Sequence, residues 1–288
     1  MALFIMLGPI AWLAIAAGLQ MAGALLFFKS TPDPILITTS IFITFGIYSL
    51  NKFTDCEDGF NCPERRMFFQ KHSKLILLPI SLFSVSLTLL ATTNRLYFFH
   101  ILLIVVGILY SVKLIPHRQF RSTGFTRLKN ILLIKNITVS LLWGITPFAL
   151  AASRVGISNI PSPSDLYVLI LAFCCTWLIN TTSCDVRDIA GDRHVGVTTV
   201  ATKLGKRNTG LYLLGFGLVT SILVCIVGAV GLAGRQVCML FIGTMLWTAI
   251  VALPIYFSNL RIPNNFIEPL IDSQAIVCGV GLITLASF

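Results

Sequence analysis

The stretch TTSCDVRDIAGDRHVGVTTVATKLGKR, residues 181–207, ends a long apolar segment and holds three of the chain's 11 acidic residues. Asp185, Asp188 and Asp192 are spaced i, i+3 and i+7, so a helix that continues through them carries all three on one face. Mg²⁺ binds a few carboxylate oxygens and completes its coordination shell with water and substrate phosphate. The stretch then adds basic side chains, namely Arg193, Lys203, Lys206 and Arg207. We therefore expect a Mg-diphosphate site, with a solvated, mixed-charge helix end as the ordinary alternative.

The composition around this stretch is that of a membrane protein. Of 288 residues, 56% are hydrophobic and 11% are charged, whereas soluble domains carry about 25% charged residues. The net charge of +10 would suggest nucleic acid in a soluble protein, but basic cytosolic loops explain it better here. We expect the lipid bilayer as a partner and no nucleic acid. The eight cysteines have no CxxC spacing, which argues against a zinc site or a disulfide framework.

Nine apolar segments are expected to cross the bilayer as helices. They cover residues 2–28, 35–50, 75–92, 96–112, 131–152, 166–182, 211–232, 237–257 and 266–286. The pattern predicts an all-α, polytopic membrane bundle of about nine transmembrane helices, forming a single domain over residues 1–288.

The basic residues predict the orientation of this bundle. Seventeen of the 21 Lys and Arg residues fall on the side that holds the acidic stretch, and four fall on the other side. Loops rich in Lys and Arg stay in the cytosol. The acidic stretch and the N-terminus are therefore predicted to be cytosolic, with the C-terminus on the opposite side.

A second acidic cluster ends the second apolar segment. It reads NKFTDCED, residues 51–58, about 130 residues before the first-described aspartates. Two such clusters, each at the end of a membrane helix, can face one another across a bundle. Lys135 lies one turn inside another apolar segment, where an ionisable group is a functional candidate unless it snorkels to the interface.

Facing carboxylates with bound metal would neutralise a diphosphate and make it a better leaving group. An isoprenyl tail on that diphosphate would lie between apolar helices, with its head at the cytosolic mouth. The allylic carbon–oxygen bond would break to a cation, and the protein would exclude water until a chosen nucleophile attacks. The chain has no Walker-type loop, GxGxxG unit or HExxH motif, so a nucleotide enzyme has no support.

These residues resemble the UbiA-type intramembrane prenyltransferase superfamily. The segment 185–207 looks like its second aspartate motif, D-x-x-D-x-x-x-D with a basic, glycine-containing tail. Asn51 and Asp55 fit the N-x-x-x-D start of its first motif, and residues 109–144 resemble its middle region. The resemblance covers nearly the whole chain and implies a helical bundle around a central cavity that binds Mg-diphosphate.

The resemblance also implies roles for individual residues. The metal ligands would be Asp55, Asp58, Asp185, Asp188 and Asp192. Of these, Asp55 and Asp188 are expected to be catalytic. The residues expected to bind the substrate are Asn51, Lys113, Lys129, Lys135 and Arg193.

The first motif departs from the family pattern N-D-x-x-D-x-x-x-D. Lys52 replaces its second residue and Gly59 its last, with Asp58 one position earlier. We expect a Mg²⁺-dependent prenyltransferase that transfers a prenyl group from a polyprenyl diphosphate to a lipophilic, aromatic acceptor. The departure leaves open a terpene cyclase of the same superfamily, which needs no acceptor, or a degenerate, non-catalytic member. A transporter is the further alternative, disfavoured because few ionisable residues lie near the bilayer midplane.

Overall fold

The fold is an all-helical bundle, as the sequence predicts. A computed structural model describes residues 2–54, 63–119, 122–131, 134–156, 162–194, 196–257 and 264–287. Its helices are α1 (Ala2–Phe27), α2 (Pro34–Thr54), α4 (Pro63–Lys71), α5 (Leu77–Thr92), α6 (Phe98–Ser111), α7 (Ile134–Val155), α8 (Pro163–His194), α9 (Val200–Ala229), α10 (Arg235–Phe257) and α11 (Asn264–Ala286), with the 3-10 turns η1 (Ser73–Ile76) and η2 (Leu128–Asn130).

Each of the nine predicted membrane segments corresponds to one helix. Within the described residues, six helices are long and apolar enough to cross a membrane, and two further apolar helices are shorter. The basic loop after α6 differs from the expectation, because it contains the antiparallel strands β1 (Ile115–Gln119) and β2 (Ser122–Thr126). The chain is thus a multi-pass integral membrane protein with one small hairpin outside the bundle.

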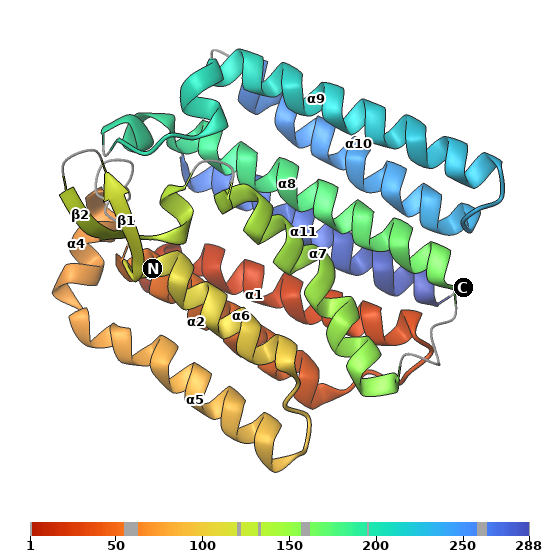
Figure 1. Ribbon diagram of the computed structural model, residues 1–288, viewed down its shortest axis with the longest axis horizontal. Helices are drawn as coiled ribbons and strands as arrows, with labels where there is room; N and C mark the ends of the chain where they lie inside the picture. The colour runs from red at the N-terminus through yellow and green to blue at the C-terminus, as the bar shows by residue number, and fades with distance from the viewer. Residues whose placement is uncertain are drawn as a thin grey trace.

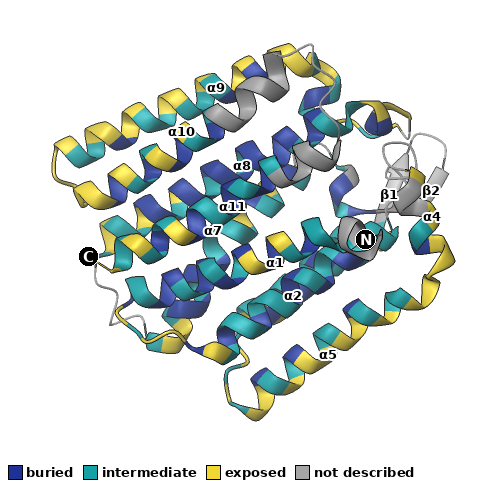
Figure 2. Ribbon diagram, turned by 180° about the vertical axis from the view of Figure 1, so that it is seen from behind, coloured by how far each residue is buried: buried dark blue, intermediate teal, exposed yellow. Residues whose placement is uncertain are grey.

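Six helices surround the centre of the bundle. α1 contacts α2 and α11, α2 contacts α6, α6 contacts α7, α7 contacts α8, and α8 contacts α11, which closes the ring. Figure 1 shows α9 and α10 along one edge of the molecule and α5 along the opposite edge. Exposed residues are common on these outer helices, whereas half of the α8 residues are buried (Figure 2). Apolar side chains on the outer helices, such as Leu218 and Leu223, are therefore suited to contact lipid.

α8 is the longest helix and extends beyond the bilayer core. Its 32 residues correspond to about 48 Å at 1.5 Å per residue, against a hydrocarbon core of about 30 Å. The helix continues past the predicted apolar segment to His194, so Asp185, Asp188 and Asp192 are helical, as their spacing predicts. We call the end of the bundle where α2 and α8 end the mouth end, and the opposite end the far end.

The packing of α7 on α8 depends on small residues. A Cβ on Gly144 would clash with the sulfur and backbone of Cys174 on α8. One turn earlier, the Ser140 hydroxyl donates to the Cys174 carbonyl at 2.6 Å. Small residues spaced by four let two membrane helices approach closely. This close contact fixes the position of the α7 N-terminus along α8, and therefore the position of Lys135.

The far end is held by an ion-pair cluster. Asp33 begins α2, where its Oδ1 accepts from the Ile35 amide at 3.0 Å and thereby caps the helix. Its Oδ2 pairs with Arg95 Nε at 2.7 Å and Arg154 Nε at 3.3 Å. The cluster joins the starts of α2 and α6 to the end of α7. Figure 1 shows the two chain termini at opposite ends of the molecule; the membrane side that each faces stays a prediction.

Candidate active site

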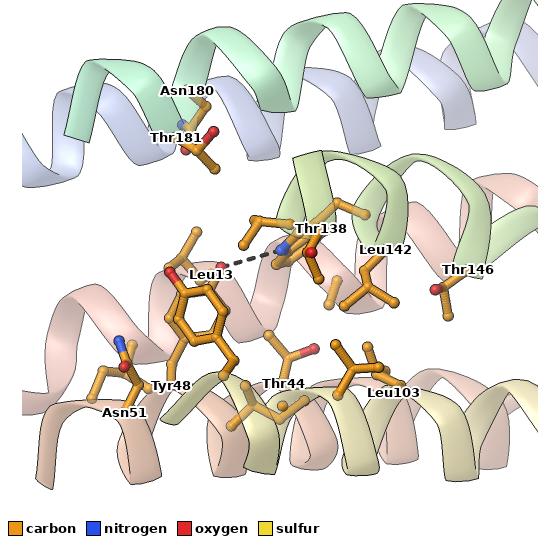
Figure 3. Close-up of a pocket in the computed structure, with 18 of the residues that line it drawn as sticks. Leu13, Thr44, Tyr48, Asn51, Leu103, Thr138, Leu142, Thr146, Asn180 and Thr181 are labelled. Carbon is orange, nitrogen blue, oxygen red and sulfur yellow. Dashed lines mark hydrogen bonds between the residues drawn. The ribbon is translucent and has the colours of Figure 1, made fainter. Parts of the chain in front are cut away.

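The ring of six helices encloses an elongated cavity of about 210 Å³. On α7 the lining runs from Lys135 near the mouth end to Leu150 near the far end, which is about 22 Å along the helix axis. In Figure 3, Thr44 and Tyr48 from α2 face Asn180 on α8 across the cavity. Charged residues line the mouth end, and the deeper wall is largely apolar. The cavity can therefore accept a molecule with an anionic head and a hydrocarbon tail.

Two of the three predicted α8 aspartates line the cavity. They are Asp188 and Asp192. Arg187 holds Asp188 through two hydrogen bonds, from Nε to Oδ1 at 2.8 Å and from Nη2 to Oδ2 at 2.7 Å. Asp192 is 3% exposed. Asn51 on α2 lines the same cavity, and its buried Oδ1 has no hydrogen-bond partner among the described residues.

The third aspartate, Asp185, does not line this cavity. Its side chain is fully buried. Oδ1 accepts from Lys135 Nζ at 2.6 Å, and Oδ2 accepts from Asn136 Nδ2 at 2.9 Å. Asn136 also donates to the Thr182 hydroxyl at 2.9 Å. Both oxygens of Asp185 are therefore engaged by α7.

The predicted substrate-binding residues divide into two groups. Asn51, Lys129 and Lys135 line the cavity. Lys113 is exposed beyond the end of α6 and lies outside the lining, because α6 ends at Ser111 and the chain leaves the bundle there. Arg193 is also exposed and outside the lining; its Nη2 donates to the Thr202 carbonyl at 3.2 Å, which joins the end of α8 to α9.

The first acidic motif is described only in part. Asp55 and Asp58 lie outside the described residues, so their expected roles stay predictions. Lys52, which replaces the family's aspartate, lines the cavity. The end of α2 is fixed by Arg127, whose guanidinium donates to the Thr54 carbonyl.

Several lining residues were not predicted from the sequence. On α8 they are Asn180, Thr181, Cys184 and Arg187; on the other helices they include Gln20, Tyr48, His100, Tyr110, Trp143 and Asp272. The α8 members precede the aspartates at helical spacing, so extending the face of Asp188 and Asp192 by two turns would have found them. For the other helices, no comparable motif in the sequence marks the inward face.

An aromatic group forms one wall of the cavity. The Trp143 ring stacks on the buried Trp177 ring with 3.9 Å between centroids and an 18° interplanar angle. Trp143 Nε1 donates to the Tyr48 hydroxyl at 3.1 Å. An aromatic face on the wall can stabilise a cation inside the cavity.

The donor atoms at the mouth suit magnesium. Asp188, Asp192 and the unpartnered Asn51 Oδ1 are all oxygen donors, the type that Mg²⁺ prefers. Within the described part of the chain, no three His, Cys, Asp or Glu side chains gather as a metal site. Because Asp185 is engaged by α7, α8 supplies two carboxylates to this mouth.

Known sequences that resemble this chain are prenyltransferases. The profile of the UbiA prenyltransferase family matches residues 71–259. The digeranylgeranylglyceryl phosphate synthase of Thermococcus gammatolerans is 28% identical over 222 residues, covering 73% of this chain and 71% of that protein. The enzyme of the same name from Pyrococcus horikoshii is 30% identical over 99 residues, covering 33% of this chain and 32% of that protein.

Solved structures share the fold. A UbiA homologue from Archaeoglobus fulgidus bound to GPP and Mg²⁺ aligns over all of both chains with a TM-score of 0.66 and 15% identity. The apo structure of a UbiA homologue from Aeropyrum pernix aligns over 96% of this chain and 98% of that one, with a TM-score of 0.61 and 15% identity.

Proposed function

Because the chain belongs to the UbiA prenyltransferase family, we propose that it is a Mg²⁺-dependent prenyltransferase that ionises a polyprenyl diphosphate and passes the prenyl group to a lipophilic acceptor. The observation that carries the proposal is one cavity with carboxylates and lysines at its mouth and largely apolar walls below. A related protein from Archaeoglobus fulgidus has been solved with GPP and Mg²⁺. The mouth is proposed to face the cytosol, following the basic residues.

Asp188 and Asp192 are proposed to hold Mg²⁺ from α8, with the Asn51 amide oxygen from α2. The first motif would add Asp55 and Asp58. Bound Mg²⁺ would neutralise the diphosphate and so stabilise it as a leaving group. Lys52, Lys129 and Lys135 line the same mouth and would bind the remaining diphosphate oxygens by charge-assisted hydrogen bonds.

The reaction then needs only one bond exchange. The allylic carbon–oxygen bond breaks, and its electron pair leaves with the diphosphate. Apolar residues and Trp143 line the cavity below the mouth. They would exclude water from the prenyl cation, and an aromatic ring can also stabilise such a charge. The acceptor's nucleophilic atom forms the new bond to the allylic carbon and gives up its proton.

The acceptor class has two candidates. An aromatic acceptor is the expectation from the sequence. The relatives named digeranylgeranylglyceryl phosphate synthase favour a second candidate, a glyceryl phosphate that already carries one prenyl chain. Nothing in these comparisons supports the terpene cyclase alternative.

The test is a transfer assay with purified protein in detergent and Mg²⁺. Geranyl, farnesyl and geranylgeranyl diphosphates are each offered alone, with a hydroxybenzoate, or with geranylgeranylglyceryl phosphate, and pyrophosphate and extracted lipids are measured. We expect pyrophosphate and a prenylated lipid only when an acceptor is present. Cyclic hydrocarbon without acceptor would replace the proposal by cyclisation, and no turnover in any combination would contradict it.

A further inference from the structure

Asp185 is a predicted metal ligand of α8 whose side chain is hydrogen-bonded by α7. We propose that it is a positioning residue that fixes Lys135 at the cavity wall, and not a ligand of the metal. The inference rests on the proposed function, because it assigns Lys135 to the diphosphate. Its basis is that Lys135 and Asn136 of another helix engage both Asp185 oxygens, at 2.6 and 2.9 Å. Asp185 also does not line the cavity, whereas Asp188, held by its neighbour Arg187, does.

The Lys135–Asp185 pair is largely removed from solvent. Asp185 is fully buried, and the Lys135 side chain is 18% exposed. A buried carboxylate is tolerated when it is paired and hydrogen-bonded on its remaining lone pairs. Lys135 supplies the charge and Asn136 the second hydrogen bond. To bind a metal ion, Asp185 would have to release at least one of these two hydrogen bonds.

The position of Lys135 in the cavity lining also indicates a role for the Lys135–Asp185 pair. Lys135 lines the main cavity together with Asp188 and Asp192, whereas Asp185 does not. An ammonium group has three N–H donors, so one can remain on Asp185 while another reaches a diphosphate oxygen. Asn136, which also donates to Thr182, holds the second carboxylate oxygen. Asp185 thus fixes where a long, flexible lysine side chain presents its charge.

Variants of Asp185 and Asp188 are therefore expected to show different defects. Asp185→Asn should raise the half-saturating concentration of prenyl diphosphate about tenfold, the effect of losing one charged hydrogen bond. Its half-saturating Mg²⁺ concentration should stay within about twofold of wild type. Asp188→Asn should instead raise the half-saturating Mg²⁺ concentration by about tenfold or more.

A charge-balanced double variant keeps the test valid if Asp185→Asn alone fails to fold. Lys135→Met with Asp185→Asn removes both charges and leaves side chains of similar size. Purified wild type, this double variant and Asp188→Asn are titrated with Mn²⁺ by electron paramagnetic resonance, without substrate. Inorganic pyrophosphate binding is measured by calorimetry for the double variant and for Lys135→Met.

We expect the double variant to bind Mn²⁺ as wild type does, within about twofold, and to bind pyrophosphate no more weakly than Lys135→Met alone. Loss of Mn²⁺ affinity in the double variant, to the level of Asp188→Asn, would overturn the inference. An additional loss of pyrophosphate affinity beyond Lys135→Met would overturn it too. A wild-type protein that binds neither Mn²⁺ nor pyrophosphate would instead refute the proposed function.

Discussion

Two aspartates of α8, one near each end, allow a functional residue to be compared with a control. Asp188 lies at the mouth of the cavity, and Asp165 lies near the other end of the same helix, where its Oδ1 accepts from the Gly234 amide at 2.6 Å. Asp188→Asn should lower the rate of prenyl transfer about 10²- to 10³-fold, as the loss of one group that stabilises transition-state charge does. Asp165→Asn, the matched control, should retain nearly full activity. Steady-state transfer assays check both, and equal activity of the two variants would contradict the metal-site assignment.

The residue scale also shows what spacing can predict. The i, i+3, i+7 pattern correctly indicated that Asp185, Asp188 and Asp192 are helical and share a face. It did not reveal that α7 covers this face at the level of Asp185 and leaves it open at Asp188 and Asp192. That difference depends on how far a neighbouring helix extends, which no local pattern contains. Lys113 is a similar case. It is exposed because α6 ends at Ser111, two residues before it, and the sequence did not mark that helix end.

At the element scale, the close approach of α7 to α8 depends on Gly144. Gly144→Ala would place a Cβ against the Cys174 sulfur and backbone, so α7 must move away from α8. We expect a loss of about 1–3 kcal/mol in stability, seen as a lower apparent melting temperature in detergent. Transfer activity should also fall, because the movement displaces Lys135 from Asp185.

The control for this substitution lies on an outer helix. Gly215 of α9 has open space where a Cβ would be, so Gly215→Ala should leave the melting temperature unchanged or slightly raised. An equal effect of the two substitutions would mean that helix propensity, rather than the α7–α8 contact, decides the outcome.

Element boundaries were less predictable than element number. Each of the nine apolar segments found by hydropathy corresponds to a helix, and six helices of the described residues are long and apolar enough to cross a membrane. Hydropathy placed the start of one segment at residue 211, whereas α9 begins at Val200 and contains a non-helical residue at Gly205, with φ 75°. The early turns carry Lys203 and Lys206 and so lack an apolar signal. The β1–β2 hairpin was missed for the same reason.

At the scale of the whole molecule, the far end depends on the charge of Asp33. Burial alone raises the pKa of this carboxyl, but the hydrogen bond and charge of Arg95 and the α2 backbone amides outweigh it and hold the pKa below its ordinary value. The stabilisation is complete above the unfolded-state pKa, about 3.9, and is lost as the pH falls through the lower, folded-state value.

Asp33→Asn isolates this charge, because asparagine still caps a helix. At pH 6 the variant should be less stable than wild type by about 1 kcal/mol. The difference should shrink on acidification below about pH 4, as the wild-type carboxylate becomes protonated. Apparent melting temperatures of both proteins across this range check the prediction, and a difference independent of pH would contradict it.

The stacked Trp143 and Trp177 rings have a practical consequence. Trp143 lines the cavity and lies 3.9 Å from Trp177, between ring centroids, while the chain's two other tryptophans, Trp12 and Trp247, are outside the lining. A prenyl chain entering the cavity changes the polarity around one indole of this stacked pair. The molecule therefore carries an intrinsic fluorescent reporter of cavity occupancy, and a Trp143→Phe variant distinguishes its signal from that of the remaining tryptophans.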